Sequence, residues 1–301
     1  MLKPFFTFFG GKWRAAPHYP APDYREIVEP FAGAAGYSVR HSQKHVTLVE
    51  KDPAIAALWS YLITTHADDI RGLPDVVGGQ SVDDFTVCPA AKTLIGFWLN
   101  KGTVTPCKTP SAWMRGDLRP KSYWGPTIRE RIATQVNKIR HWEIYQGDYC
   151  LARNKTATWF IDPPYQKAGR AYRCSSRDIN FEDLGNWCRS RLGQVMVCEN
   201  TGATWLPFTH FRNIKSLEGK SGKALSAEAL YTHHVTEVNN MPKLFFHHAK
   251  TGRDYEIIRM AEDKSEITLR GEHTEFTTPY DKELFQRLGY SLVKKEVEDA
   301  A

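Results

Sequence analysis

Short apolar runs separated by amphipathic stretches set the pattern of the first two thirds of the chain. Each run is rich in β-branched or aromatic residues and ends at a polar residue or a turn, which is typical of a buried strand. The pattern predicts strands at 26–29, 46–50, 158–162 and 194–198. It predicts helices at 36–44, 54–65 and 181–191. Alternating strands and helices indicate an α/β fold with a parallel sheet covered on both faces, and ligands of such sheets bind at the carboxyl ends of the strands.

Two stretches depart from this alternation. Residues 68–142 contain a glycine pair, several prolines and scattered aromatic residues, which predicts a separate, mainly helical lobe inserted into a sheet domain formed by 1–67 and 143–236. Residues 237–301 predict a small α+β module at the C-terminus. Its expected elements are strands at 257–260, 267–269 and 290–293 and a helix at 281–288.

Composition and charge narrow the class of protein. The chain is 42% hydrophobic and 25% charged, with no run of eighteen apolar residues and no signal-peptide pattern, so we expect a cytoplasmic protein that does not enter a membrane. Its six cysteines are widely spaced without a C-x-x-C pair, which predicts free thiols and no metal site.

Charge is unevenly distributed along the chain. Residues 92–155 hold twelve Lys and Arg against four Asp and Glu, whereas residues 254–301 hold seven Lys and Arg against twelve Asp and Glu. The basic segment indicates either a polyanion-binding face or a solvated charged surface.

A small-residue turn and a carboxylate follow the first two predicted strands. The segment 31–36 reads FAGAAG and joins a strand to a helix, so its backbone allows close approach of a ligand to the helix N-terminus. Glu50 ends the second strand, where a carboxylate accepts hydrogen bonds from ribose hydroxyls in nucleotide-binding sheets. The pair predicts an adenosine-like ligand, which is either a dinucleotide or S-adenosylmethionine.

The segment Asp162-Pro163-Pro164-Tyr165 ends the third predicted strand. Two prolines fix the backbone as a rigid corner, so that the Asp162 carboxylate and the Pro163 carbonyl point outward as two acceptors. An adenine amino group has two hydrogens to donate, and the Tyr165 ring offers a face for stacking. A plain turn at the end of a strand is the alternative interpretation.

Five segments together resemble the Dam-type adenine DNA methyltransferases, the alpha group of amino-methyltransferases. The resemblance covers about residues 5–231 and implies a Rossmann-like methyltransferase sheet with helices on both faces. Fainter similarity lies at 195–200 (VMVCEN) and 227–231 (AEALY). In chain order, the five segments are 8–13 (FFGGKW), 29–36 (EPFAGAAG), 49–52 (VEKD), 147–149 (GDY) and 162–165 (DPPY).

The resemblance implies a function and a role for each matching residue. It implies transfer of a methyl group from S-adenosylmethionine to the exocyclic amino nitrogen of adenine in DNA, with Lys12 on the methionine carboxylate, Glu50 on the ribose, and Asp148 and Tyr149 on the cofactor adenine or the target base. The catalytic residues would be Asp162, Pro163, Pro164 and Tyr165. The cofactor-binding residues would be Phe9, Gly10, Lys12, Trp13, Phe31, Gly33, Gly36, Glu50, Asp148, Tyr149 and Asp162.

The inserted lobe would then be the target-recognition domain for double-stranded DNA. The segment 98–101 resembles the family's LNR segment, with Lys101 in place of arginine. Thr7 stands where members that read GATC carry lysine, so the sequence does not define the target site. A monomer or weak dimer is expected. The candidate DNA-binding residues are Lys101, Arg115, Arg119, Lys121, Arg129, Arg131 and Arg170.

Three alternatives remain open at this stage. A related amino-methyltransferase would act on RNA adenine, cytosine or protein glutamine, although Asp162 at the first motif position favours DNA adenine. A DNA-binding protein would keep the fold without turnover. A dinucleotide-dependent oxidoreductase would share the sheet, but the turn at 31–36 lacks the G-x-G-x-x-G pattern.

Overall fold

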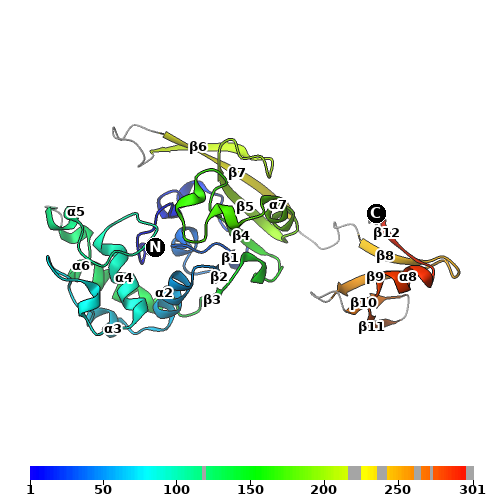
Figure 1. Ribbon diagram of the computed structural model, residues 1–301, viewed down its shortest axis with the longest axis horizontal. Coiled ribbons are helices and arrows are strands. Elements are labelled where there is room, and N and C mark those ends of the chain that lie inside the picture. Colours follow the sequence, from blue (N-terminus) through cyan, green and yellow to red (C-terminus); the bar gives the residue numbers. More distant parts are fainter. Residues whose placement is uncertain (117–119, 216–224, 236–242, 261–265, 272–273, 296–301) are drawn as a thin grey trace. The chain divides into compact units, whose positions relative to one another are not determined.

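The computed structural model describes residues 1–301 except 117–119, 216–224, 236–242, 261–265, 272–273 and 296–301 (Figure 1). The chain divides into two compact units, residues 1–236 and residues 237–301. Within the described residues, no helix has both the length and the apolar character needed to cross a bilayer.

The first unit is built on a seven-stranded, mostly parallel sheet, so the predicted α/β class is confirmed and is compatible with a Rossmann-like fold. The strand order is β3-β2-β1-β4-β5-β7-β6. The strand β7 is antiparallel to both of its neighbours, which the sequence did not predict. The strands are β1 (Glu26–Glu29), β2 (His45–Glu50), β3 (Glu143–Gln146), β4 (Ala157–Ile161), β5 (Gly193–Asn200), β6 (Thr209–Lys215) and β7 (Leu225–Val235).

Alternate residues of the buried strands face two separate apolar clusters, which is why β4 is almost entirely apolar. In β4, Trp159 and Ile161 pack into one cluster with Leu184 of α7 (Phe181–Arg189). Phe160 faces the other cluster, which contains residues of α1 (Gly36–Arg40) and α2 (Pro53–Thr64). Both faces of the sheet are therefore covered. The helix predicted at 36–44 is shorter than expected, since α1 ends at Arg40.

The sheet has its topological switch point between β1 and β4. From β1 the chain proceeds to β2 and β3 on one side, and from β4 it proceeds to β5 on the other. Because the register pairs Ile27 with Thr158 and Val28 with Trp159, the segments that follow β1 and β4 leave the sheet at the same edge. Ligands of open α/β sheets bind in the crevice at this point.

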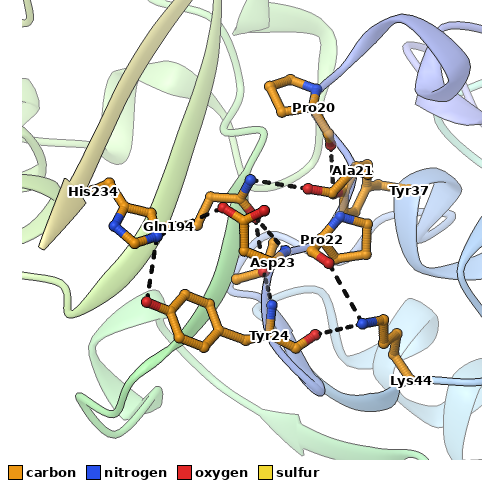
Figure 2. Close-up of polar contacts among 10 residues, drawn as sticks. Pro20, Ala21, Pro22, Asp23, Tyr24, Tyr37, Lys44, Gln194 and His234 are labelled. Atoms are coloured by element: carbon orange, nitrogen blue, oxygen red, sulfur yellow. Dashed lines mark hydrogen bonds and ion pairs between the residues drawn. The ribbon is translucent and has the colours of Figure 1, made fainter. Parts of the chain in front are cut away.

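The opposite, amino edge of the sheet is closed by the segment that leads into β1 (Figure 2). The Gln194 side chain donates to the Ala21 carbonyl at 2.9 Å and accepts from the Asp23 N–H at 3.1 Å. Tyr24 and His234 are stacked, with 3.3 Å between the Tyr24 hydroxyl and His234 Nε2. These contacts fix the start of β1 against β5 and β7.

The insertion contains only helical elements among its described residues. They are α3 (Ala67–Arg71), α4 (Pro89–Leu99), α5 (Ala112–Gly116), α6 (Pro126–Val136) and the short 3-10 turns Val82–Asp84, Pro120–Ser122 and Asn137–Ile139. Leu94 and Phe97 of α4 and Ile132 of α6 belong to the same apolar cluster as Ile27 and Leu48 of the sheet. The insertion thus shares the sheet's core instead of forming a unit of its own, in contrast to the separate lobe that the sequence pattern predicted.

The second unit is a five-stranded antiparallel sheet in the order β11-β10-β9-β8-β12, with α8 (Lys282–Arg287) packed on it. Its core is small and contains two aromatic residues, Phe246 and Phe285, and two aliphatic residues, Ile267 and Leu269. The strands β8 and β11 were not predicted. The strands are β8 (Lys243–His248), β9 (Arg253–Met260), β10 (Glu266–Arg270), β11 (Glu275–Pro279) and β12 (Tyr290–Lys295).

Candidate active site at the switch point

The turn after β1 is held by the carboxylate at the end of β2. Gly33 and Ala35 both have a φ of 45°, so the backbone reverses in the left-handed region before α1 begins. Glu50 accepts hydrogen bonds from the backbone N–H groups of Gly33 and Asp52, each at 2.8 Å. Burial raises the pKa of Glu50, and these two hydrogen bonds oppose the rise. Each carboxylate oxygen has a second lone pair, which leaves acceptor capacity for a ligand.

The turn also contacts the FFGGKW segment directly. The position of a Cβ on Gly36 would lie 2.3 Å from the backbone nitrogen of Trp13, closer than any side chain permits. The Phe8 ring borders Gly33, and the indole of Trp59 donates to the Gly33 carbonyl at 2.7 Å. The small residues therefore serve close backbone packing, which brings two of the predicted motifs together.

Hydrogen bonds and close packing hold the corner at 162–165, which follows β4. The N–H of Gln166 donates to the Glu199 carboxylate at 2.9 Å, and the N–H of Gly169 donates to the Tyr165 carbonyl at 2.7 Å. Gly169 packs so closely that a Cβ would lie 2.5 Å from the carbonyl carbon of Pro164. Asp162 follows the last residue of the strand and keeps one fifth of its side chain exposed. The corner is thus rigid, as its two prolines predict.

Lys12 links the segment 8–13 (FFGGKW) to the corner at 162–165. Its ammonium lies 2.9 Å from Oδ1 of Asp162, 3.8 Å from Oε1 of Glu228 and 4.9 Å from the centre of the Tyr165 ring. Lys12 is 7% exposed. Burial by itself lowers the pKa of Lys12, but Asp162, followed by Cys198 and Glu228, outweighs it and the net shift is upward. The site therefore places a buried ammonium between the side chains of Asp162 and Glu228.

Burial raises the pKa of the carboxylates around Lys12, with the ammonium opposing the shift at Asp162 and Glu228. Burial also raises the pKa of Glu29, the last residue of β1, to about 8, against hydrogen bonds from Ser38. Perturbed titratable groups gathered in a crevice are typical of functional sites. Sequence reasoning did not single out Glu228, Glu29 or Glu199. The only sequence signal for Glu228 was its place in the 227–231 segment.

Several other predicted cofactor-binding residues lie at the same carboxyl edge of the sheet. The rings of Phe31 and Tyr149 are stacked, with centroids 5.4 Å apart and an interplanar angle of 27°. Tyr172, which was not predicted, donates from its hydroxyl to the Phe9 carbonyl at 3.2 Å and lies against Gly10.

Two residues of the predicted set make contacts that stabilise the fold. The indole of Trp13 donates to the Leu2 carbonyl at 3.0 Å, and Asp148 forms an exposed ion pair with Lys51 at 2.9 Å.

The basic residues proposed for DNA divide into two groups. Arg129 donates to the Leu73 carbonyl and pairs with Asp75 at 2.7 Å, while Arg131 lies over the Trp98 ring and donates to the Pro4 carbonyl. These two guanidinium groups are engaged inside the protein, which does not fit the expectation of free phosphate contacts.

The second group is more accessible. Lys121 and Arg170 are exposed, and Arg115 is exposed while donating to the Pro110 carbonyl. Lys101 lies over the Tyr123 ring at 4.4 Å. Arg119 lies outside the described residues.

Comparison with protein-family models gives no match for the chain, and a search of curated proteins gives no significant relative. The geometry of the site therefore carries the functional argument. Among the described residues, no group of three or more His, Cys, Asp and Glu side chains is arranged to hold a metal ion. The cysteines Cys188 and Cys198 are buried free thiols, and Cys88 and Cys150 are exposed free thiols.

Proposed function

We propose that the chain is an S-adenosylmethionine-dependent DNA methyltransferase that modifies the exocyclic amino nitrogen of adenine. One observation carries the proposal. The Asp162 carboxylate stands at the switch point of the sheet, and Lys12, from the segment that contacts the 31–36 turn, joins it at 2.9 Å. A nucleoside cofactor on that turn and a base on that carboxylate would lie side by side.

The residues around the 31–36 turn fit a nucleoside with an amino-acid tail. Glu50 has acceptor capacity for ribose hydroxyls, and the stacked Phe31 and Tyr149 offer an aromatic surface for an adenine ring. Lys12 is assigned to the methionine carboxylate by resemblance, and here its ammonium contacts Asp162 instead. The cofactor would supply an electrophilic methyl group on a sulfonium.

The corner at 162–165 would activate the target amino group. Its nitrogen is a poor nucleophile because the lone pair is delocalised into the ring. Hydrogen bonds from the amino group to the Asp162 carboxylate and the Pro163 carbonyl would return electron density to the nitrogen, and the rigid corner would hold it for in-line attack. The target base must leave the duplex, which costs a few kcal/mol, and stacking on Tyr165 would offset part of that cost. No covalent enzyme intermediate is needed, so no cysteine acts as a nucleophile.

Double-stranded DNA would contact the exposed basic residues of the insertion and of the loop after the corner. Lys121, Arg115 and Arg170 present charge to solvent and would neutralise phosphates. We further propose that the protein is cytoplasmic and is a monomer or a weak dimer.

Sequencing of DNA from cells that express the protein, by a method that detects modified bases, tests the proposal. We expect N6-methyladenine in one sequence context, confirmed by nucleoside mass spectrometry. The variant Asp162→Ala should abolish it, whereas Asp68→Ala, which removes an exposed carboxylate on α3, should leave it unchanged. Methyl groups found only on cytosine would overturn the assignment to adenine. Protection from thermal unfolding by NAD and not by S-adenosylmethionine would favour an oxidoreductase.

A further inference from the structure

The Lys12 ammonium occupies the position at which the proposed target amino group would donate. It lies 2.9 Å from Asp162 Oδ1 and over the Tyr165 ring, the two groups assigned to the base. An ammonium, like an adenine amino group, is a hydrogen-bond donor without acceptor capacity at neutral pH. A base that donates to Oδ1 of Asp162 and stacks on Tyr165 therefore competes with Lys12 for the same place.

A buried ammonium cannot simply be released. Removing one partner of a buried ion pair leaves an uncompensated charge, which is strongly destabilising. Lys12 is almost completely buried, so the charge needs another carboxylate when a neutral amino group takes its place at Asp162. The entry of the base thus depends on where Lys12 can go.

Glu228 is placed to receive the ammonium. Its Oε1 lies 3.8 Å from Lys12 Nζ, and a shift of about 1 Å would give a charge-assisted contact of normal length. Its other oxygen, Oε2, accepts from the Tyr19 hydroxyl at 3.3 Å, which fixes the carboxylate. Tyr19 is itself stacked on Phe211 and packed against Phe160, so this support is rigid.

The other buried carboxylates of the site are already engaged. Glu29 accepts from the Ser38 N–H at 2.7 Å. Glu199 accepts from two backbone N–H groups and from the indole of Trp205. The structure gives an ion pair with Lys12 only to Asp162 and Glu228 among the described residues.

We propose that Lys12 blocks the target-base acceptor and that Glu228 is the positioning residue that receives its ammonium when the base enters. The inference rests on the proposed function and deepens it. Asp162 then exchanges a charged donor for a neutral one, and the lysine charge stays paired throughout. Glu228 touches no reacting atom and acts through Lys12.

Duplexes that carry either adenine or purine at the target position provide the test, since purine lacks the amino group that competes with Lys12. The ratio of their Kd values, measured with sinefungin present, reports the docking of the amino group on Asp162. We expect Glu228→Gln to reduce the preference for adenine about tenfold or more, because the ammonium keeps its hydrogen bond to the Gly10 carbonyl but loses its second carboxylate. Glu228→Asp should restore it to within threefold. Glu26→Gln, which removes a carboxylate paired with Lys155 at the amino edge, should leave it unchanged.

The same substitution made in a Lys12→Met variant distinguishes this role of Glu228 from general support of the fold. In Lys12→Met, the substitution Glu228→Gln should no longer alter the preference. An equal loss in that background, or an unchanged preference in Glu228→Gln alone, would overturn the proposal.

Thermal unfolding without DNA gives an independent measurement. The losses in Tm for Lys12→Met and Glu228→Gln should be non-additive, and additive losses would contradict the shared lysine. If the wild-type protein transfers no methyl group to DNA but the losses in Tm are coupled, the proposed function fails and the ion-pair geometry stands.

Discussion

The Glu50 carboxylate accepts a hydrogen bond from the N–H of Gly33 at 2.8 Å, so the end of β2 holds the turn that follows β1. We expect Glu50→Gln to weaken S-adenosylmethionine binding at least tenfold, because an amide has one acceptor oxygen where the carboxylate has two. Isothermal titration calorimetry would measure the change. Glu143→Gln, at an exposed glutamate of β3, is the control. Equal affinities of wild type and Glu50→Gln would remove Glu50 from the cofactor site.

Asp162 should matter for methyl transfer far more than for cofactor binding. We expect Asp162→Asn to lower the single-turnover rate about 10²–10³-fold, because an amide presents a donor to the target amino group and loses the negative charge. The affinity for S-adenosylmethionine should change less than fivefold. A rapid-quench assay with labelled cofactor measures the rate, and a rate within threefold of wild type would contradict the assigned role.

Glu29 should make the fold less stable as pH rises. Its pKa is about 8 in the folded protein and 4.5 when exposed, so both states are protonated below pH 4.5. Between pH 4.5 and 8 only the unfolded chain ionises, and the free energy of unfolding falls across that window. Glu29→Gln, which can still accept from Ser38, should reduce this fall by an amount on the order of a few kcal/mol. Chemical denaturation at pH 5 and pH 8 measures it, and identical pH dependence in both proteins would refute the shift.

Close packing at Gly36 leaves no room for a side chain. A Cβ there would lie 2.3 Å from the Trp13 nitrogen, and backbone atoms cannot yield as side chains do. We expect Gly36→Ala to cost about 3 kcal/mol of unfolding free energy. Gly72→Ala is the matched control, because Gly72 has a φ of −74° and its Cβ would lie 3.4 Å from the Asp68 carbonyl oxygen. Equal stabilities for the two variants would count against this packing.

The two groups of basic residues should respond differently to alanine substitution. Lys121→Ala and Arg170→Ala should each reduce the slope of log affinity for DNA against log salt by about 1, with Tm unchanged. Arg129→Ala should lower Tm and leave the slope unchanged, because its guanidinium is engaged by Leu73 and Asp75. Fluorescence anisotropy at several salt concentrations measures the slopes. A wild-type slope near zero would remove the insertion's proposed role in binding DNA.

The sequence predicted the central strands well, because β1, β2, β4 and β5 each contain a short apolar run that is buried on both faces of the sheet. It missed β7, in which exposed residues such as Thr232 and His234 interrupt the apolar pattern. It also identified the turn at 31–36 and the corner at 162–165. The pairing of Lys12 with Asp162 and Glu228 joins residues separated by 150 positions or more, and no local pattern encodes such a contact.

The N-terminal segment that carries Lys12 runs along α4 of the insertion. The indole of Trp98 donates to the Phe5 carbonyl, the Thr7 hydroxyl donates to the Phe97 carbonyl, and the Phe9 N–H donates to the Thr103 carbonyl. A chimaera that transplants the insertion alone would cut these bonds. An exchange of the insertion, and of the target recognition proposed for it, should therefore move the first dozen residues together with it as a single unit.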